Sequence, residues 1–91
     1  MVATAVHEHR YVHEVPGVNG GYPVVRGTRT PVRSIVEIFR QLDDFDRTAA
    51  YFSHLSPEQV RDALEYYIVH PERVDEDQRL NQAAWRRLTG R

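Results

Sequence analysis

The feature that most constrains the fold is a change in the spacing of apolar residues at Thr30-Pro31. Upstream, residues 7–15 alternate with the period of two that is typical of a strand. Downstream, apolar residues recur every three or four positions, as on one face of a helix. These positions are Val32, Ile35, Val36, Phe39 and Leu42. With Thr30 as N-cap and Pro31 at the first helical position, we expect strands first and helices afterwards.

Residues 7–26 predict a β-hairpin. Its first strand would place His7, His9, Tyr11, His13 and Val15 on one face. The run Pro16-Gly17-Val18-Asn19-Gly20-Gly21 predicts the turn, because Gly and Asn tolerate the positive φ of a tight reversal. Residues 22–26 would form a second short strand at an edge, since Pro23 cannot donate a ladder hydrogen bond. Residues 1–5 have no pattern and are expected to be a loose end.

Three more helices are predicted after the first. One begins after Asp44 and ends near Phe52. The next has the clearest start, with Ser56 as N-cap, Pro57 at the first position and Gln59 completing a capping box. Its apolar face would contain Val60, Ala63, Leu64, Tyr67 and Ile68.

His70-Pro71 would end that helix, and a last helix is expected over residues 74–88. Leu80, Ala84 and Leu88 share one stripe of it, with Trp85 beside them and Gly90 at its end. The predicted fold is mainly α, with a short N-terminal hairpin, a three-helix core that resembles a helix-turn-helix in outline, and a C-terminal helix. We divide the chain into an extension and strand (1–11), a core with the hairpin (12–71) and a C-terminal helix or tail (72–91).

Composition narrows the class of protein. The chain of 91 residues makes one domain and has no cysteine, which excludes disulfides and thiolate metal sites. It has no long apolar run and no signal-peptide pattern, so a cytoplasmic location is expected.

Charge is segregated along the chain. Its net value is +2 over residues 1–42, −7 over residues 43–77 and +4 over residues 78–91. All 12 basic residues are Arg, which a codon bias explains as well as a preference for anionic partners does.

Two stretches resemble a known family. The run Gly20-Gly21-Tyr22-Pro23-Val24-Val25-Arg26-Gly27-Thr28-Arg29-Thr30-Pro31-Val32, followed by Ser34-Ile35-Val36-Glu37, is similar to domain-of-unknown-function family 433 (DUF433). The stretch from Tyr51 to Val60, followed by Ala63-Leu64-Glu65-Tyr66-Tyr67, resembles the helix-turn-helix half of the same family.

The resemblance implies a homeodomain-like or winged helix-turn-helix fold and the role of an antitoxin. Such a protein would neutralise a PIN-like ribonuclease toxin encoded nearby, and would bind its own promoter DNA. A homodimer is expected on separate grounds, because the edge-type hairpin and the amphipathic terminal helix are both surplus to a three-helix core. The alternatives are a stand-alone DNA-binding regulator and a protein-interaction adaptor that no longer touches DNA.

Candidate DNA-binding residues lie in two segments. Arg26, Thr28, Arg29 and Arg33 surround the start of the first helix, where free backbone N–H groups favour an anion. Gln59 and Arg61 lie on the third predicted helix, whose outer face (Glu58, Gln59, Arg61, Asp62, Glu65 and Tyr66) would carry a net charge of −2. We therefore expect the first segment to matter more for DNA, unless Gly27 only makes a required turn and Arg29 pairs with a carboxylate of the acidic middle segment.

Candidate partner-binding residues lie on the last helix. They are Leu80, Trp85, Arg86, Arg87 and Leu88, an aromatic anchor with apolar and cationic neighbours. Arginines of this kind suit the acidic metal pocket that a PIN-type nuclease carries. The alternative is that Trp85 and Leu88 fold back onto the core.

No catalytic site or cofactor is predicted. His7, His9 and His13 share a strand face but lack the spacing of a zinc site. The acidic run Asp43-Asp44-Asp46 predicts a turn and a helix start, and no nucleophile, base and oxyanion donor come together. We therefore expect a protein that is not an enzyme.

Overall fold

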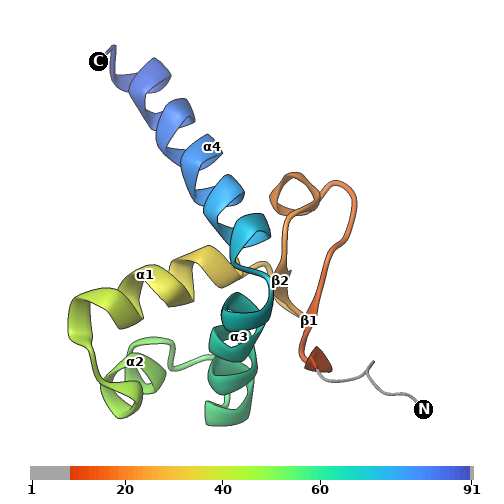
Figure 1. Ribbon diagram of the computed structural model, residues 1–91, viewed down its shortest axis with the longest axis vertical. Coiled ribbons are helices and arrows are strands. Elements are labelled where there is room, and N and C mark those ends of the chain that lie inside the picture. Colours follow the sequence, from red (N-terminus) through yellow and green to blue (C-terminus); the bar gives the residue numbers. More distant parts are fainter. Residues whose placement is uncertain (1–8, 91) are drawn as a thin grey trace.

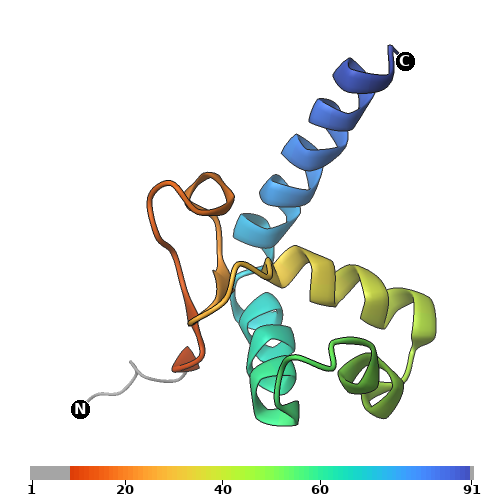
Figure 2. The same ribbon diagram turned by 180° about the vertical axis from the view of Figure 1, so that it is seen from behind.

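A computed structural model describes residues 9–90. The predicted loose end 1–5, strand residues His7 and Glu8, and the terminal Arg91 lie outside this range. The elements follow in the order β1 (Val12–His13), the 3-10 turn η2 (Asn19–Gly21), β2 (Val24–Val25), α1 (Val32–Leu42), α2 (Phe45–Tyr51), α3 (Pro57–Val69) and α4 (Pro71–Thr89) (Figures 1 and 2). The predicted mainly helical fold with a short N-terminal hairpin is confirmed.

The hairpin is antiparallel, with Val12 opposite Val25 and His13 opposite Val24. Both strands are shorter than predicted from the alternating pattern. The first stops short because the Tyr11 N–H donates to the Asp62 carboxylate on α3, at 2.8 Å, instead of extending the ladder. The expectation of a strand through His9 is therefore wrong.

The turn between the strands forms as predicted. Gly17 and Gly21 have φ of 85° and 87°, values that only glycine adopts readily. The turn closes with the 3-10 segment η2, which brings Asn19 and the Gly21 carbonyl beside α4.

Helix α1 does not start as predicted. Its N-cap is Pro31, and no side chain caps it. The Thr30 side chain is hydrogen-bonded to His54 Nε2 at 2.8 Å, and the Thr30 carbonyl accepts the Val25 N–H. Thr30 therefore belongs to the turn before α1 and is not its cap.

Helices α2 and α3 begin where the sequence predicts. The Asp44 side chain accepts the Arg47 N–H at 2.8 Å and caps α2. The Ser56–Gln59 capping box of α3 is present in both directions.

The predicted apolar face of α3 is partly wrong. Val60 is fully buried, whereas Ile68 is 75% exposed. The eight positions from Val60 to Ile68 rotate the helix by about 80° more than two full turns. Ile68 therefore points away from the face that Val60 buries.

The core lies where the hairpin and all four helices meet. Helix α1 contacts α2, α3 and α4, and so occupies the centre of the helical part. Core residues that are entirely buried include Val25, Val32, Ile35, Val60 and Ala63. Val74 of α4 is also part of this core, at 2% exposure.

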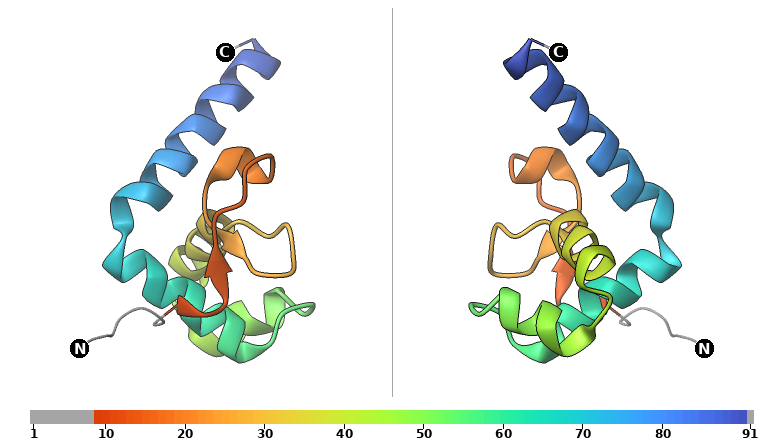
Figure 3. Two further views of the ribbon diagram at one scale, coloured as in Figure 1. Left: turned by 90° about the vertical axis from the view of Figure 1, so that its right-hand side faces the viewer. Right: turned by 90° about the vertical axis from the view of Figure 1, so that its left-hand side faces the viewer.

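Helix α4 follows α3 almost without a break. His70 ends α3 and precedes Pro71, the first residue of α4, so the helix starts earlier than the predicted position 74. Its outer half extends beyond the rest of the molecule (Figures 1 and 3), which makes the protein 49 Å long against 29 Å and 21 Å in the other directions. Among the described residues, no helix combines the length and apolar character needed to cross a bilayer.

Candidate functional site

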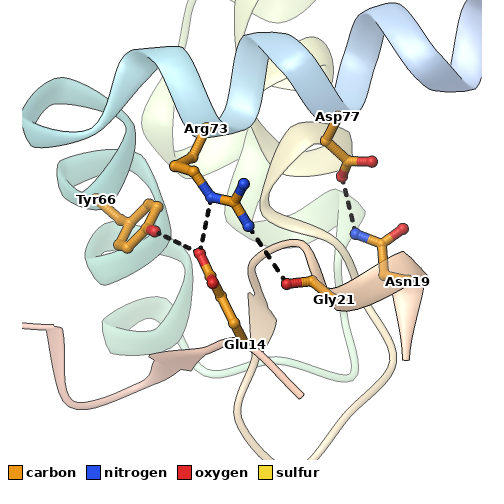
Figure 4. Close-up of polar contacts among 6 residues, drawn as sticks. All are labelled: Glu14, Asn19, Gly21, Tyr66, Arg73 and Asp77. Carbon is orange, nitrogen blue, oxygen red and sulfur yellow. Dashed lines mark hydrogen bonds and ion pairs between the residues drawn. The ribbon is translucent and has the colours of Figure 1, made fainter. Parts of the chain in front are cut away.

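The inner half of α4, residues 71–79, is fastened to the body by a buried carboxylate. Asp77 is only 6% exposed. Its Oδ2 accepts a hydrogen bond from Asn19 Nδ2 at 2.8 Å and lies 3.1 Å from Nε of Arg33 on α1 (Figure 4 shows the contact with Asn19). One carboxylate thus joins α4 to both the hairpin turn and α1.

A second fastening surrounds Arg73. Its Nε donates to Glu14 Oε2 at 3.1 Å, and Tyr66 donates its hydroxyl to the same oxygen at 3.3 Å (Figure 4). The Arg73 guanidinium also lies 4.4 Å from the centre of the Tyr22 ring. Burial raises the pKa of Tyr66 to about 12, and the negative charge of Glu14 adds to this shift.

The third contact is with α1. Gln78 Nε2 donates to Glu37 Oε1 at 2.8 Å. Beside this bond α1 and α4 line a cavity of about 240 Å³ that is open to solvent. Its lining includes Arg40 and Gln41 from α1 and Asp75 and Gln82 from α4. The inner half of α4 therefore has a defined orientation on α1.

The outer half of α4, residues 80–90, has no such contacts. Leu80 is 48% exposed, Trp85 60% and Leu88 81%. Arg86 and Arg87 are exposed as well. The helix is nevertheless completed, since Gly90 ends it with a left-handed φ of 77°. The alternative in which Trp85 and Leu88 fold back onto the core is therefore not found.

Some of the predicted DNA-binding residues near α1 form hydrogen bonds or ion pairs within the fold, and others are exposed. Arg26 Nε donates to the Arg10 carbonyl at 2.9 Å, and its Nη1 lies 3.2 Å from His13 Nδ1. Thr28 Oγ1 donates to the Val25 carbonyl at 2.9 Å and so closes the turn.

Arg29 and Arg33, predicted together, have different surroundings. Arg29 is exposed. Arg33 is largely buried in its ion pair with Asp77, so its guanidinium serves the attachment of α4.

On α3, the outer face differs from the predicted one. Asp62 is buried, at 7% exposure, because its carboxylate accepts the Tyr11 N–H and lies 3.3 Å from His9 Nδ1. The expectation that Asp62 is exposed is therefore wrong. Of the two DNA candidates here, Gln59 uses its side chain in the capping box, and Arg61 lies 5.1 Å from the Phe45 ring centre.

The histidines do not gather. His9 packs edge-on against Tyr66 and His70, whereas His13 faces Arg26. Within residues 9–90, no three His, Cys, Asp or Glu side chains are placed to hold a metal ion.

The residues that orient α4 were not identified from the sequence. Glu14 and Arg73 are 59 positions apart, and Asn19 and Asp77 are 58 apart. No local pattern links residues at such separations. A signal that could have pointed to Asp77 is Arg33 itself, because it lies in the first turn of α1, where the helix dipole disfavours a cation without an anionic partner.

Comparison with known proteins gives a family and one related structure. The family described as a protein of unknown function (DUF433) matches residues 12–67. The crystal structure of a DUF433 member from Anabaena variabilis ATCC 29413 is similar, with a TM-score of 0.65 and 31% identity. The similarity covers 74% of this chain and 66% of that one, so this chain spans just under two thirds of its relative. No curated protein matches. The family match ends before α4.

Proposed function

We propose that this chain, which belongs to the DUF433 family of proteins of unknown function, is an antitoxin that binds and neutralises a PIN-like ribonuclease encoded beside it. The observation that carries the proposal is the outer half of α4. There a Trp and two Leu are exposed on a helix that extends beyond the body.

This surface has the composition of a protein interface. Trp and Arg dominate the few residues that supply most of the binding free energy in such interfaces. Helical spacing places Leu80, Ala84 and Leu88 in one row, with Trp85 next to it. An amphipathic helix of this kind binds by laying its apolar face in a groove of the partner.

Charge supports a partner with an acidic pocket. Residues 79–90 contain Arg79, Arg86 and Arg87 and no acidic residue. The metal pocket of a PIN-type nuclease is acidic, and guanidinium groups bind carboxylates through paired hydrogen bonds. Such complementarity also accelerates association at low salt.

The cavity between α1 and α4 adds a second contact on the same side. Gln82 lines this cavity, and Trp85 follows it by three residues, about one helical turn. A partner segment lying on Trp85 would therefore reach the polar groups of the cavity.

Promoter binding and dimerisation are the remaining parts of the proposal. The exposed Arg26 and Arg29 on the turn before α1 support contact with DNA. The exposed leucines of α4 support self-association, because closed two-fold dimers are the commonest assemblies. Neither part is needed for neutralisation.

The test is a ribonuclease assay with the PIN-like protein encoded next to this chain. We expect cleavage to cease when the full-length chain reaches a stoichiometric amount. Replacing both Arg86 and Arg87 with Glu should slow association at low salt, and the effect should fade at high salt. Arg47→Glu, an exposed charge reversal on α2, is the matched control and should leave inhibition unchanged. Full cleavage in the presence of excess wild-type chain would refute the proposal.

A further inference from the structure

The turn between β2 and α1 is held in a single conformation by its own hydrogen bonds. The Val25 N–H donates to the Thr30 carbonyl at 2.9 Å, and the Thr28 N–H donates to the Val25 carbonyl at 3.0 Å. The Thr28 hydroxyl accepts the Thr30 N–H at 3.0 Å. Gly27 provides the positive φ, 82°, that the turn requires. This turn projects from the body (Figure 3) and presents a fixed backbone.

Two exposed arginines, Arg26 and Arg29, belong to this turn, and a third, Arg10, lies in the segment whose backbone Arg26 contacts. Arg26 is joined to the segment that precedes β1, because its Nε donates to the Arg10 carbonyl at 2.9 Å. The Arg10 guanidinium lies 5.3 Å from the centre of the Tyr11 ring, a cation–π arrangement that restrains it. All three side chains, those of Arg10, Arg26 and Arg29, are exposed. We call these three residues the arginine turn.

Within the part of the chain that the structure describes, no carboxylate pairs with the arginine turn. Three ion pairs form within residues 9–90, and none of them includes Arg10, Arg26 or Arg29. Within residues 9–90, the Glu14 carboxylate pairs with Arg73 and not with any of these three arginines. Positive charge is therefore available at this edge for a partner.

The alternative surface, the outer face of α3, is less suited to a polyanion. Its one exposed arginine, Arg61, lies between the exposed Glu58 and Glu65, which leaves a net charge of −1. DNA carries one negative charge for every ~1.7 Å of its axis, so this face would be repelled.

From this distribution we infer that the arginine turn binds the backbone phosphates of double-stranded DNA, with Arg10 as a contact residue beside Arg26 and Arg29. The inference rests on the DNA-binding part of the proposed function. Guanidinium groups on a preformed turn suit phosphate oxygens, which accept paired hydrogen bonds. Such contacts fix the position of a protein on DNA and do not read its sequence.

The experiment measures the affinity of the full-length chain for a short mixed-sequence DNA duplex, by fluorescence anisotropy from ~50 to ~200 mM salt. The variants are Arg10→Ala and Arg29→Ala, chosen because neither side chain forms a hydrogen bond within residues 9–90. Arg79→Ala on α4 removes the same charge at a distant exposed site and is the control. Unchanged melting of each variant shows that the fold is retained.

Each of the two variants should lower the slope of log affinity against log salt by about one, and the double variant by about two. Arg79→Ala should leave the slope unchanged. If the wild-type chain binds no duplex at ~50 mM salt, the DNA-binding part of the proposed function fails and the inference fails with it. If the wild type binds but Arg61→Ala alone reduces the slope, the inference is wrong and α3 is the DNA-binding face.

Discussion

Asp77→Ala tests whether a buried carboxylate holds α4 to the body. The Asp77 side chain is 9% exposed and that of its partner Arg33 is 19% exposed. Removing one member of a buried ion pair costs ~3–5 kcal/mol, because the other charge remains without a partner. Since Arg33 keeps some access to water, we expect the free energy of unfolding to fall by about 2–3 kcal/mol.

Glu14→Ala provides the matched control, because it removes a carboxylate that also fastens α4. Here both side chains of the pair are more exposed, 38% for Arg73 and 41% for Glu14. Exposed pairs contribute under about 1 kcal/mol, so the expected loss is correspondingly small.

Urea unfolding followed by circular dichroism measures both variants against the wild type. In a domain of this size, the loss for Asp77→Ala corresponds to a fall in Tm of roughly 10–20 °C. Adding Arg33→Met to Asp77→Ala should restore part of the stability, because no unpaired charge then remains. Equal losses for Asp77→Ala and Glu14→Ala would refute the assignment of Asp77 as the principal fastening.

Two other variants test the core and the hydroxyl at the base of α4. Ile35 is entirely buried, so Ile35→Ala should lower the free energy of unfolding by ~2–5 kcal/mol. Ile68 is 75% exposed, so Ile68→Ala should change it by less than ~0.5 kcal/mol. Similar losses for the two variants would contradict the described core. The raised pKa of Tyr66, about 12 against 10.0, means that the unfolded chain releases this proton first, so the contribution of Tyr66 to stability should be fully present below pH 10 and should be lost as the pH rises from 10 to 12. In Tyr66→Phe the fall in stability over this range should be shallower, and an identical alkaline profile would show that Tyr66 does not carry the shift.

Local signals predicted the elements of this fold well. The Ser56–Gln59 capping box and the Asp44 cap involve residues three positions apart, and both form. The turn at residues 16–21 follows from the conformational freedom of Gly and Asn. These are interactions within one segment, and the sequence displays them directly.

Contacts between distant segments could not be predicted. Thr30 has the residue type of a cap, but its hydroxyl contacts His54, 24 positions away. Asp62 has the residue type of an exposed position, but the hairpin strand covers it and donates Tyr11 N–H to it. In each case a tertiary hydrogen bond overrides a local preference, and one chain alone gives no sign of its partner.

For the candidate site too, the local pattern could be predicted from the sequence, and the contacts between distant segments could not. The apolar stripe and Trp85 were visible as a helical pattern, and the structure leaves them exposed. Whether they packed on the core depended on the direction of α4, which Arg73 and Asp77 set through contacts with the hairpin. That direction required the three-dimensional structure.

The central claim is that the outer half of α4 binds the toxin, and Trp85→Ala tests it most directly. Two quantities are measured on the full-length variant: its affinity for the PIN-like ribonuclease encoded beside it, and its own Tm. Because Trp85 is 60% exposed, its replacement should leave the Tm unchanged. The affinity should weaken by about thirtyfold or more, which corresponds to the loss of ~2 kcal/mol expected for an aromatic anchor. A lower Tm with unchanged affinity would contradict the claim.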